Sequence, residues 1–202
     1  VSAFLGYKNF PGQICISLND EVVHGIGATG KILRSGDLIS VEIGVSIDSF
    51  IGDTAASFIV GDASPLRPDV RMLLEKTHEA LMSGIDAAKA GNRVRDISAA
   101  VEKVAKLANL GVVREYVGHG IGCALHEPPE IPNFTSKNTG TLLRDGMVLA
   151  IEPMFNLGTY KVKTDKDRWT VRTADGRLSA HFEHMILINS DKPEVLTWPK
   201  MM

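Results

Sequence analysis

A change in the spacing of apolar residues limits the folds open to this chain. Short apolar runs at 14–18, 38–45 and 50–60 alternate or cluster as strands do, with turn-forming residues between them. Between Pro68 and Gly91 the apolar residues fall at three- and four-residue steps, which predicts an amphipathic helix. The chain therefore begins with strands and then turns to helix.

A second helix is predicted from a cap at Asp96 to a stop at Gly111. The elements expected after it are a strand into Tyr116-Val117, a proline-rich loop through Pro128, Pro129 and Pro132, a strand at 147–151, a hairpin around 174–176 and a strand at 185–188. Strands, then helices, then strands favour an α+β fold with a mixed or largely antiparallel sheet over a doubly wound fold.

Composition narrows the class of protein further. With 202 residues, 44% of them hydrophobic, residues 1–202 can bury a core as a single domain. A net charge of −2 offers no basic surface for nucleic acid, and no apolar run is long enough to cross a membrane. Cys15 and Cys123 lack metal-knuckle spacing, and the first residues do not resemble an export signal. We expect a cytoplasmic monomer.

The most informative short motif is Gly118-His119-Gly120. Glycines let the backbone pass close to a neighbouring group, and an imidazole held there is a natural ligand for a divalent metal. The alternative is a tight turn with a buried histidine.

Four carboxylates stand at similar places on the predicted strands. Glu42 and Asp53 lie within strands, Glu152 follows an apolar strand, and Glu183 precedes another. A buried carboxylate needs a partner, so these four and His119 are candidates for one cluster. Oxygen ligands with one imidazole suit divalent first-row metals, and bridging carboxylates would hold two ions. Four separate salt-bridged or solvated carboxylates are the alternative.

Together these motifs resemble one family, type I methionine aminopeptidase, over nearly the whole chain. The matching segments, in order, are Asn19–Ile26, Gly52-Asp53-Thr54, Gly118–Gly122 with His126-Glu127-Pro128, Ile151–Met154, Trp169-Thr170-Val171 and Phe182-Glu183-His184.

The resemblance implies the pita-bread fold, in which two pseudo-symmetric halves surround a dinuclear metal centre and the helices lie on one side of the sheet. It also implies removal of the N-terminal methionine from nascent polypeptides by a hydroxide shared between two divalent ions. Cobalt, manganese, iron and zinc all suit such a site. The ribosome is a further candidate partner, and we expect no membrane or nucleic-acid partner.

The family's ligand positions carry over residue by residue. Asp53 and Glu183 would bridge both ions, and His119 and Glu152 would complete one site. Glu42 stands where the family has an aspartate that chelates the other ion.

The resemblance also assigns residues around the substrate. His126 and His24 would contact the scissile peptide, with His126 stabilising the tetrahedral intermediate, and Glu152 could accept the proton of the attacking water. The methionine pocket would be lined by Tyr7, Phe10, Cys15, Leu125, Met154 and Trp169.

This chain departs from the family pattern in several places. Glu42 adds a methylene to the expected aspartate, His181 stands where glutamine is usual, and Met185 stands where threonine is usual. Family members also carry an N-terminal helical portion ahead of the pocket segment. We expect this chain to lack it, because Val1 is so close to that segment.

Two other functions are compatible with the same residues. One is a related Xaa-Pro metallopeptidase. Val41–Gly44 gives it slight support, and the Trp169 segment and the Glu183-His184 pair argue against it. The other is a non-catalytic pita-bread domain that binds peptides or a partner, suggested by Glu42 and His181.

Overall fold

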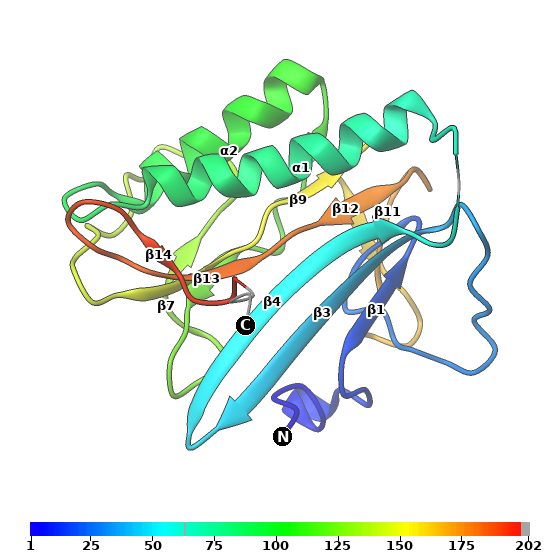
Figure 1. The fold of residues 1–202 in the computed structure, drawn as a ribbon, viewed down its shortest axis with the longest axis horizontal. Coiled ribbons are helices and arrows are strands. Elements are labelled where there is room, and N and C mark those ends of the chain that lie inside the picture. Colours follow the sequence, from blue (N-terminus) through cyan, green and yellow to red (C-terminus); the bar gives the residue numbers. More distant parts are fainter. Residues whose placement is uncertain (63, 199–202) are drawn as a thin grey trace.

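The computed structural model describes residues 1–62 and 64–198. Two helices, α1 (Pro68–Ala87) and α2 (Val94–Ala108), lie side by side on one side of the strands (Figure 1). The strands before the helices are β1 (Cys15–Leu18), β2 (Glu21–Val23), β3 (Leu38–Ile47) and β4 (Phe50–Ile59), preceded by the short helix η1 (Tyr7–Asn9). The strands after them are β5 (Gly111–Val112), β6 (Gly118–Gly120), β7 (Glu127–Ile131), β8 (Val148–Ile151), β9 (Met154–Asn156), β10 (Val162–Thr164), β11 (Val171–Thr173), β12 (Ser179–His181), β13 (His184–Leu187) and β14 (Glu194–Val195).

The strands form four sheets, and every strand pair among the described residues is antiparallel. The orders are β1-β3-β4, β10-β11-β2, β12-β9-β5 and β14-β13-β8-β6-β7. The prediction of an α+β fold with a largely antiparallel sheet is confirmed.

Both helices bury their apolar stripes against these sheets. Leu73 and Ala80 of α1 and Val101 of α2 form one core cluster with Phe155 of β9. A second cluster contains Leu81 and Ile85 of α1, Val94 and Ile97 of α2, and Leu149 and Ile151 of β8. Burial of such side chains contributes roughly 1.5–3 kcal/mol each, so the helices hold the strands of different sheets together.

The boundaries differ from the sequence-based prediction in several places. Helix α2 begins at Val94, with Asp96 inside its first turn, where the Asp96 carboxylate accepts a hydrogen bond from the Arg93 backbone N–H at 2.7 Å. It ends at Ala108, because Asn109 adopts a left-handed conformation with φ 54°.

Three other segments were also predicted wrongly. Residues 127–131, expected in a proline-rich loop, form the edge strand β7, whose position at the sheet edge tolerates prolines. Residues 174–176 form a turn, but the flanking strands β11 and β12 belong to different sheets, so no hairpin forms there. The strand expected to reach Tyr116-Val117 is instead split into β5 and β6. No helix within the described ranges is long and apolar enough to cross a membrane.

Candidate metal centre

The candidate centre lies where the β3–β4 hairpin meets the five-stranded sheet. Ala55 of β4 forms a bridge with Glu183: the Glu183 N–H donates to Ala55 O at 2.8 Å. The Thr54 hydroxyl also donates to Glu183 O, at 2.8 Å. These contacts bring Asp53 of β4 next to Glu183, although 130 residues separate them in the sequence.

Three of the predicted ligands come together directly. Ligand atoms of Asp53, His119 and Glu183 all lie within 4.8 Å of one another, and all three residues are buried. His119 lies on β6, which pairs with β8 in the middle of the five-stranded sheet. The alternative of four separately solvated carboxylates is thereby excluded for Asp53 and Glu183.

The glycines beside His119 are explained by backbone packing. A Cβ at Gly118 would lie 2.4 Å from Ala150 O of β8, and one at Gly120 would lie 2.3 Å from Pro128 O of β7. Both contacts are too short for any side chain. His119 therefore lies in a strand squeezed between two neighbours, which rules out the alternative of a tight turn.

Glu152 follows β8 directly and lies between two histidines. Its Oε1 is 3.5 Å from His119 Nε2, and its Oε2 is 3.8 Å from His181 Nε2. Asn133 Nδ2 donates to the Glu152 carbonyl at 3.1 Å. His181, which stands where the related family usually has glutamine, is thus within reach of a predicted ligand.

Glu42 lies on β3 and also lines the cavity described below. It is paired in register with Cys15 of β1, and the Cys15 thiol hydrogen-bonds to its carboxylate. Burial raises the pKa of Glu42 to about 7. Burial, and then the charges of Glu42, Asp53 and Glu183, raises the pKa of the Cys15 thiol far above its usual range.

The ionised forms of the other three carboxylates are also destabilised by burial, and in addition by the negative charges of their neighbours. Burial raises the pKa of Asp53, Glu152 and Glu183 well above the usual range, and the negative charges of their neighbours raise it further. Within the described residues, Asp53 Oδ1 and Glu183 Oε1 are buried without a hydrogen-bond partner. Unpaired buried carboxylate oxygens around one imidazole fit a divalent cation, which would neutralise their charge.

A cavity of about 180 Å³ opens beside this cluster. Most predicted pocket residues and ligands line it: Tyr7, Phe10, Cys15, His24, Glu42, Asp53, His119, Leu125, His126, Glu152 and Trp169. Glu183 is buried next to Asp53 and does not line the cavity.

One predicted pocket residue lies elsewhere. Met154 is fully buried and packs against Val22, Val23 and Val171, with no part in the cavity lining. Met154 starts β9, where strand alternation and the core cluster decide which way its side chain points. Conversely, sequence reasoning missed Phe4, Lys8, Val23, Tyr116 and Val117, which line the cavity. For Tyr116 and Val117 the available signal was their position directly before the glycine-flanked histidine.

Two histidines face this cavity in the neutral form. Burial lowers the pKa of His24 to about 4. Burial and then the charges of His119, Lys8 and His24 lower the pKa of His126 to about 4. His126 Nδ1 hydrogen-bonds with the Tyr7 hydroxyl at 2.9 Å, which orients the imidazole ring.

The fold and the cluster together define a class: an antiparallel α+β scaffold with a carboxylate-rich candidate metal centre beside a cavity. The model of metallopeptidase family M24 matches residues 3–190 of the chain. The chain belongs to this family.

Curated relatives are similar over almost the whole chain. The methionine aminopeptidase 1 of Bacillus subtilis is 46% identical over 197 residues, covering 98% of this chain and 78% of that protein. The methionine aminopeptidase of Clostridium acetobutylicum is 44% identical, with the same coverage.

Solved structures agree with this similarity. The methionine aminopeptidase of Thermotoga maritima superposes with a TM-score of 0.94 at 40% identity, covering 98% of this chain and 78% of that one. An X-Pro aminopeptidase from the same organism, 18% identical with a TM-score of 0.71, shares the fold alone. The pita-bread fold implied by the sequence motifs is confirmed.

The raised pKa of Glu42 predicts how the stability of the metal-free folded protein depends on pH. The folded-state pKa of Glu42 lies above its ordinary value, so the folded protein holds this proton where the unfolded chain has released it. The resulting stabilisation is present below the unfolded pKa and is lost as pH rises through about 7. In chelator, the melting temperature should therefore fall between about pH 5 and pH 8, and less so in Glu42→Gln.

Adding manganese at the upper pH should restore the lost stability, because the cation binds the folded cluster. A metal-free protein whose melting temperature is constant over this interval would contradict the electrostatic reading of the cluster.

Proposed function

We propose that this chain is a methionyl aminopeptidase that uses two divalent ions to remove the N-terminal methionine from peptides. The observation that carries the proposal is the position of the cluster. Asp53, His119 and Glu152 form the floor of a cavity whose walls are aromatic and apolar. Two soft or aromatic groups, Cys15 and Trp169, suit a thioether side chain in that cavity.

We assign the ligands to the two ions as follows. Asp53 and Glu183 would be shared by both ions, His119 and Glu152 would hold one of them, and Glu42 would hold the other. Cobalt, manganese, iron and zinc are all compatible with these donors. When bound, such ions polarise a carbonyl group and activate water at neutral pH.

The remaining groups act on the peptide. His126, neutral at pH 7, donates a hydrogen bond to the scissile carbonyl oxygen as negative charge develops there. Its partner Tyr7 fixes the ring, and the tilted contact with His119 (4.3 Å between ring centroids) places it beside the cluster. His24 contacts the peptide from the Trp169 side of the cavity. Glu152 accepts the proton of the attacking water.

The side chains that line the cavity determine which substrate side chain fits there. Phe10 and Trp169 meet edge to face, with ring centroids 5.1 Å apart, and Leu125 closes the cavity between them and the cluster. An unbranched methionine side chain fits a narrow space of this kind better than a branched one.

We propose that residues 1–202 act as one domain and as a cytoplasmic monomer. Both helices contribute to both large core clusters, which supports a single folding unit. Contact with the ribosome stays a prediction.

The direct test is release of methionine from Met-Ala-Ser in manganese, with Xaa-Pro peptides as the comparison. His126→Ala should lower turnover by roughly 100- to 1,000-fold, as loss of an oxyanion donor does, with metal content unchanged. His78→Ala is the matched control, because His78 lies on α1 outside the cavity lining.

Equal turnover by the parent and His126→Ala would contradict the assigned role. Cleavage of Xaa-Pro but not Met-Ala peptides would establish the proline-directed alternative. If metal-loaded protein cleaves neither kind of peptide, the remaining alternative is a non-catalytic domain that binds peptides or a partner.

Glu42 generates a separate prediction about the two ions. Its longer side chain must reach the ion while also accepting the Cys15 hydrogen bond, so only the site it serves loses an ideal ligand. We expect one tightly held and one weakly held ion. Glu42→Asp should raise occupancy of the weak site and activity at limiting metal, whereas Glu42→Ala should lower both.

Calorimetric titration with manganese, paired with peptide turnover, measures both effects. Two sites of equal affinity in the parent, or weaker binding by Glu42→Asp, would show that the surrounding chain has adjusted to glutamate.

A further inference from the structure

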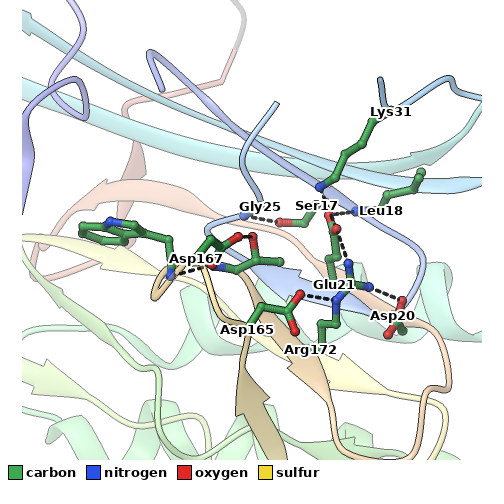
Figure 2. Close-up of polar contacts among 11 residues, drawn as sticks. Ser17, Leu18, Asp20, Glu21, Gly25, Lys31, Asp165, Asp167 and Arg172 are labelled. Carbon is green, nitrogen blue, oxygen red and sulfur yellow. Dashed lines mark hydrogen bonds and ion pairs between the residues drawn. The ribbon is translucent and has the colours of Figure 1, made fainter. Parts of the chain in front are cut away.

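A buried carboxylate, that of Glu21, joins its own strand and the Lys31 loop to the distant Arg172 (Figure 2). Glu21 begins β2, three residues before His24, and only 1% of its side chain is exposed. Its Oε2 accepts a hydrogen bond from Leu18 N at 2.8 Å. Its Oε1 accepts from Lys31 Nζ at 2.6 Å and from Arg172 Nη2 at 2.7 Å. The start of β2 is therefore fixed by charge-assisted bonds.

Arg172 of β11 extends this network to the turn that carries Trp169. Besides Glu21, its guanidinium donates to Asp20 Oδ1 at 2.7 Å and to Asp165 Oδ2 at 2.6 Å. A planar guanidinium can serve three carboxylates at once, which a lysine ammonium cannot do with the same geometry. Arg172 thus ties β2 to the segment just before Trp169.

The Trp169 turn is itself rigidly bonded. The Asp167 Oδ1 accepts from Trp169 N and Thr170 N, each at 2.8 Å, and its Oδ2 accepts from the Thr170 hydroxyl at 2.6 Å. Asp165 N donates to Thr170 O at 2.8 Å. Movement of Asp165 would consequently move the Trp169 backbone.

The His24 turn is equally constrained. His24 has φ 58°, a left-handed conformation that is costly for a residue other than glycine. Its neighbour Gly25 packs so tightly that a Cβ would lie 2.2 Å from Ile16 O, and Gly25 N donates to Ser17 Oγ at 3.1 Å. The His24 and Trp169 rings meet edge to face, with centroids 6.1 Å apart.

We propose that Glu21 and Arg172 form a clamp that positions His24 and Trp169 against each other across the substrate cavity. Both clamped rings line the cavity, whereas Glu21 and Arg172 do not, so the pair acts as positioning residues. The clamp joins the His24 turn, whose backbone is strained, to the turn that carries Trp169. Its kinetic consequence rests on the proposed function, but its structural consequence does not.

The test uses Trp169 as a reporter. The chain has two tryptophans, so Trp198→Phe leaves Trp169 as the sole tryptophan. In that background, Arg172→Gln should increase acrylamide quenching of Trp169 fluorescence. It should also lower kcat/KM for Met-Ala-Ser by roughly 10- to 100-fold, since small misplacements of positioning groups have effects of this size. Manganese affinity should be unchanged, because the clamp holds no ligand.

The matched control is Arg67→Gln, which removes an exposed arginine–carboxylate pair with Asp69 far from the cavity lining. It should change neither quenching nor kcat/KM. If Arg172→Gln does not fold, the same measurements are made on Asp165→Asn. This substitution removes only the carboxylate that links the clamp to the Trp169 turn.

A folded Arg172→Gln or Asp165→Asn variant with parental quenching and parental kcat/KM would overturn the proposal, even if its melting temperature falls. Loss of metal affinity in step with kcat/KM would also overturn it, since the pair would then act on the cluster. If the parent itself does not cleave Met-Ala-Ser, the proposed function fails, and the quenching comparison alone still decides the clamp.

Discussion

The structure depends on one electrostatic constraint: several carboxylates share a buried space with His119, and His181 lies within 3.8 Å of one of them, Glu152. Asp53 and Glu183 keep buried oxygens without hydrogen-bond partners among the described residues. Such an arrangement is costly when the groups are ionised and stable when cations lie between them. The scaffold imposes the arrangement, because the Ala55–Glu183 bridge joins the β3–β4 hairpin to the five-stranded sheet. His119 completes it from a central strand whose neighbours leave no room for side chains beside it.

Much of this could be predicted from the sequence, because it depends on local patterns. The three- and four-residue steps of α1 report burial directly. In β3 the alternation indicates a strand but not its buried face, because Ile43, Val45 and Ile47 are exposed. The glycines around His119 reflect close backbone approach, which requires glycine whatever the tertiary context. Glu42 and Asp53 could be placed on strands by their flanking apolar residues. The cost of burying lone carboxylates suggested one cluster with His119, and the family resemblance then implied a role for each ligand.

Other features could not be predicted, because they depend on contacts between distant segments. The prolines around residues 128–132 indicate a loop, yet an edge strand accepts them since its outer side needs no hydrogen bonds. Met154 suits a thioether pocket by chemistry but points into the core, because β9 pairs between β5 and β12. Glu21 and Arg172 are 151 residues apart and look like ordinary surface charges in the sequence. Only the antiparallel pairing of β2 with β11 brings them together.

The central claim is that these carboxylates and His119 hold two divalent ions beside the substrate cavity. Anomalous diffraction from crystals grown with manganese tests it most directly, because it locates the metal independently of activity. The account predicts two peaks that share Asp53 and Glu183, one next to His119 and Glu152 and the other next to Glu42. Manganese-containing crystals without anomalous density at these residues, or with density only at other carboxylates, would contradict it.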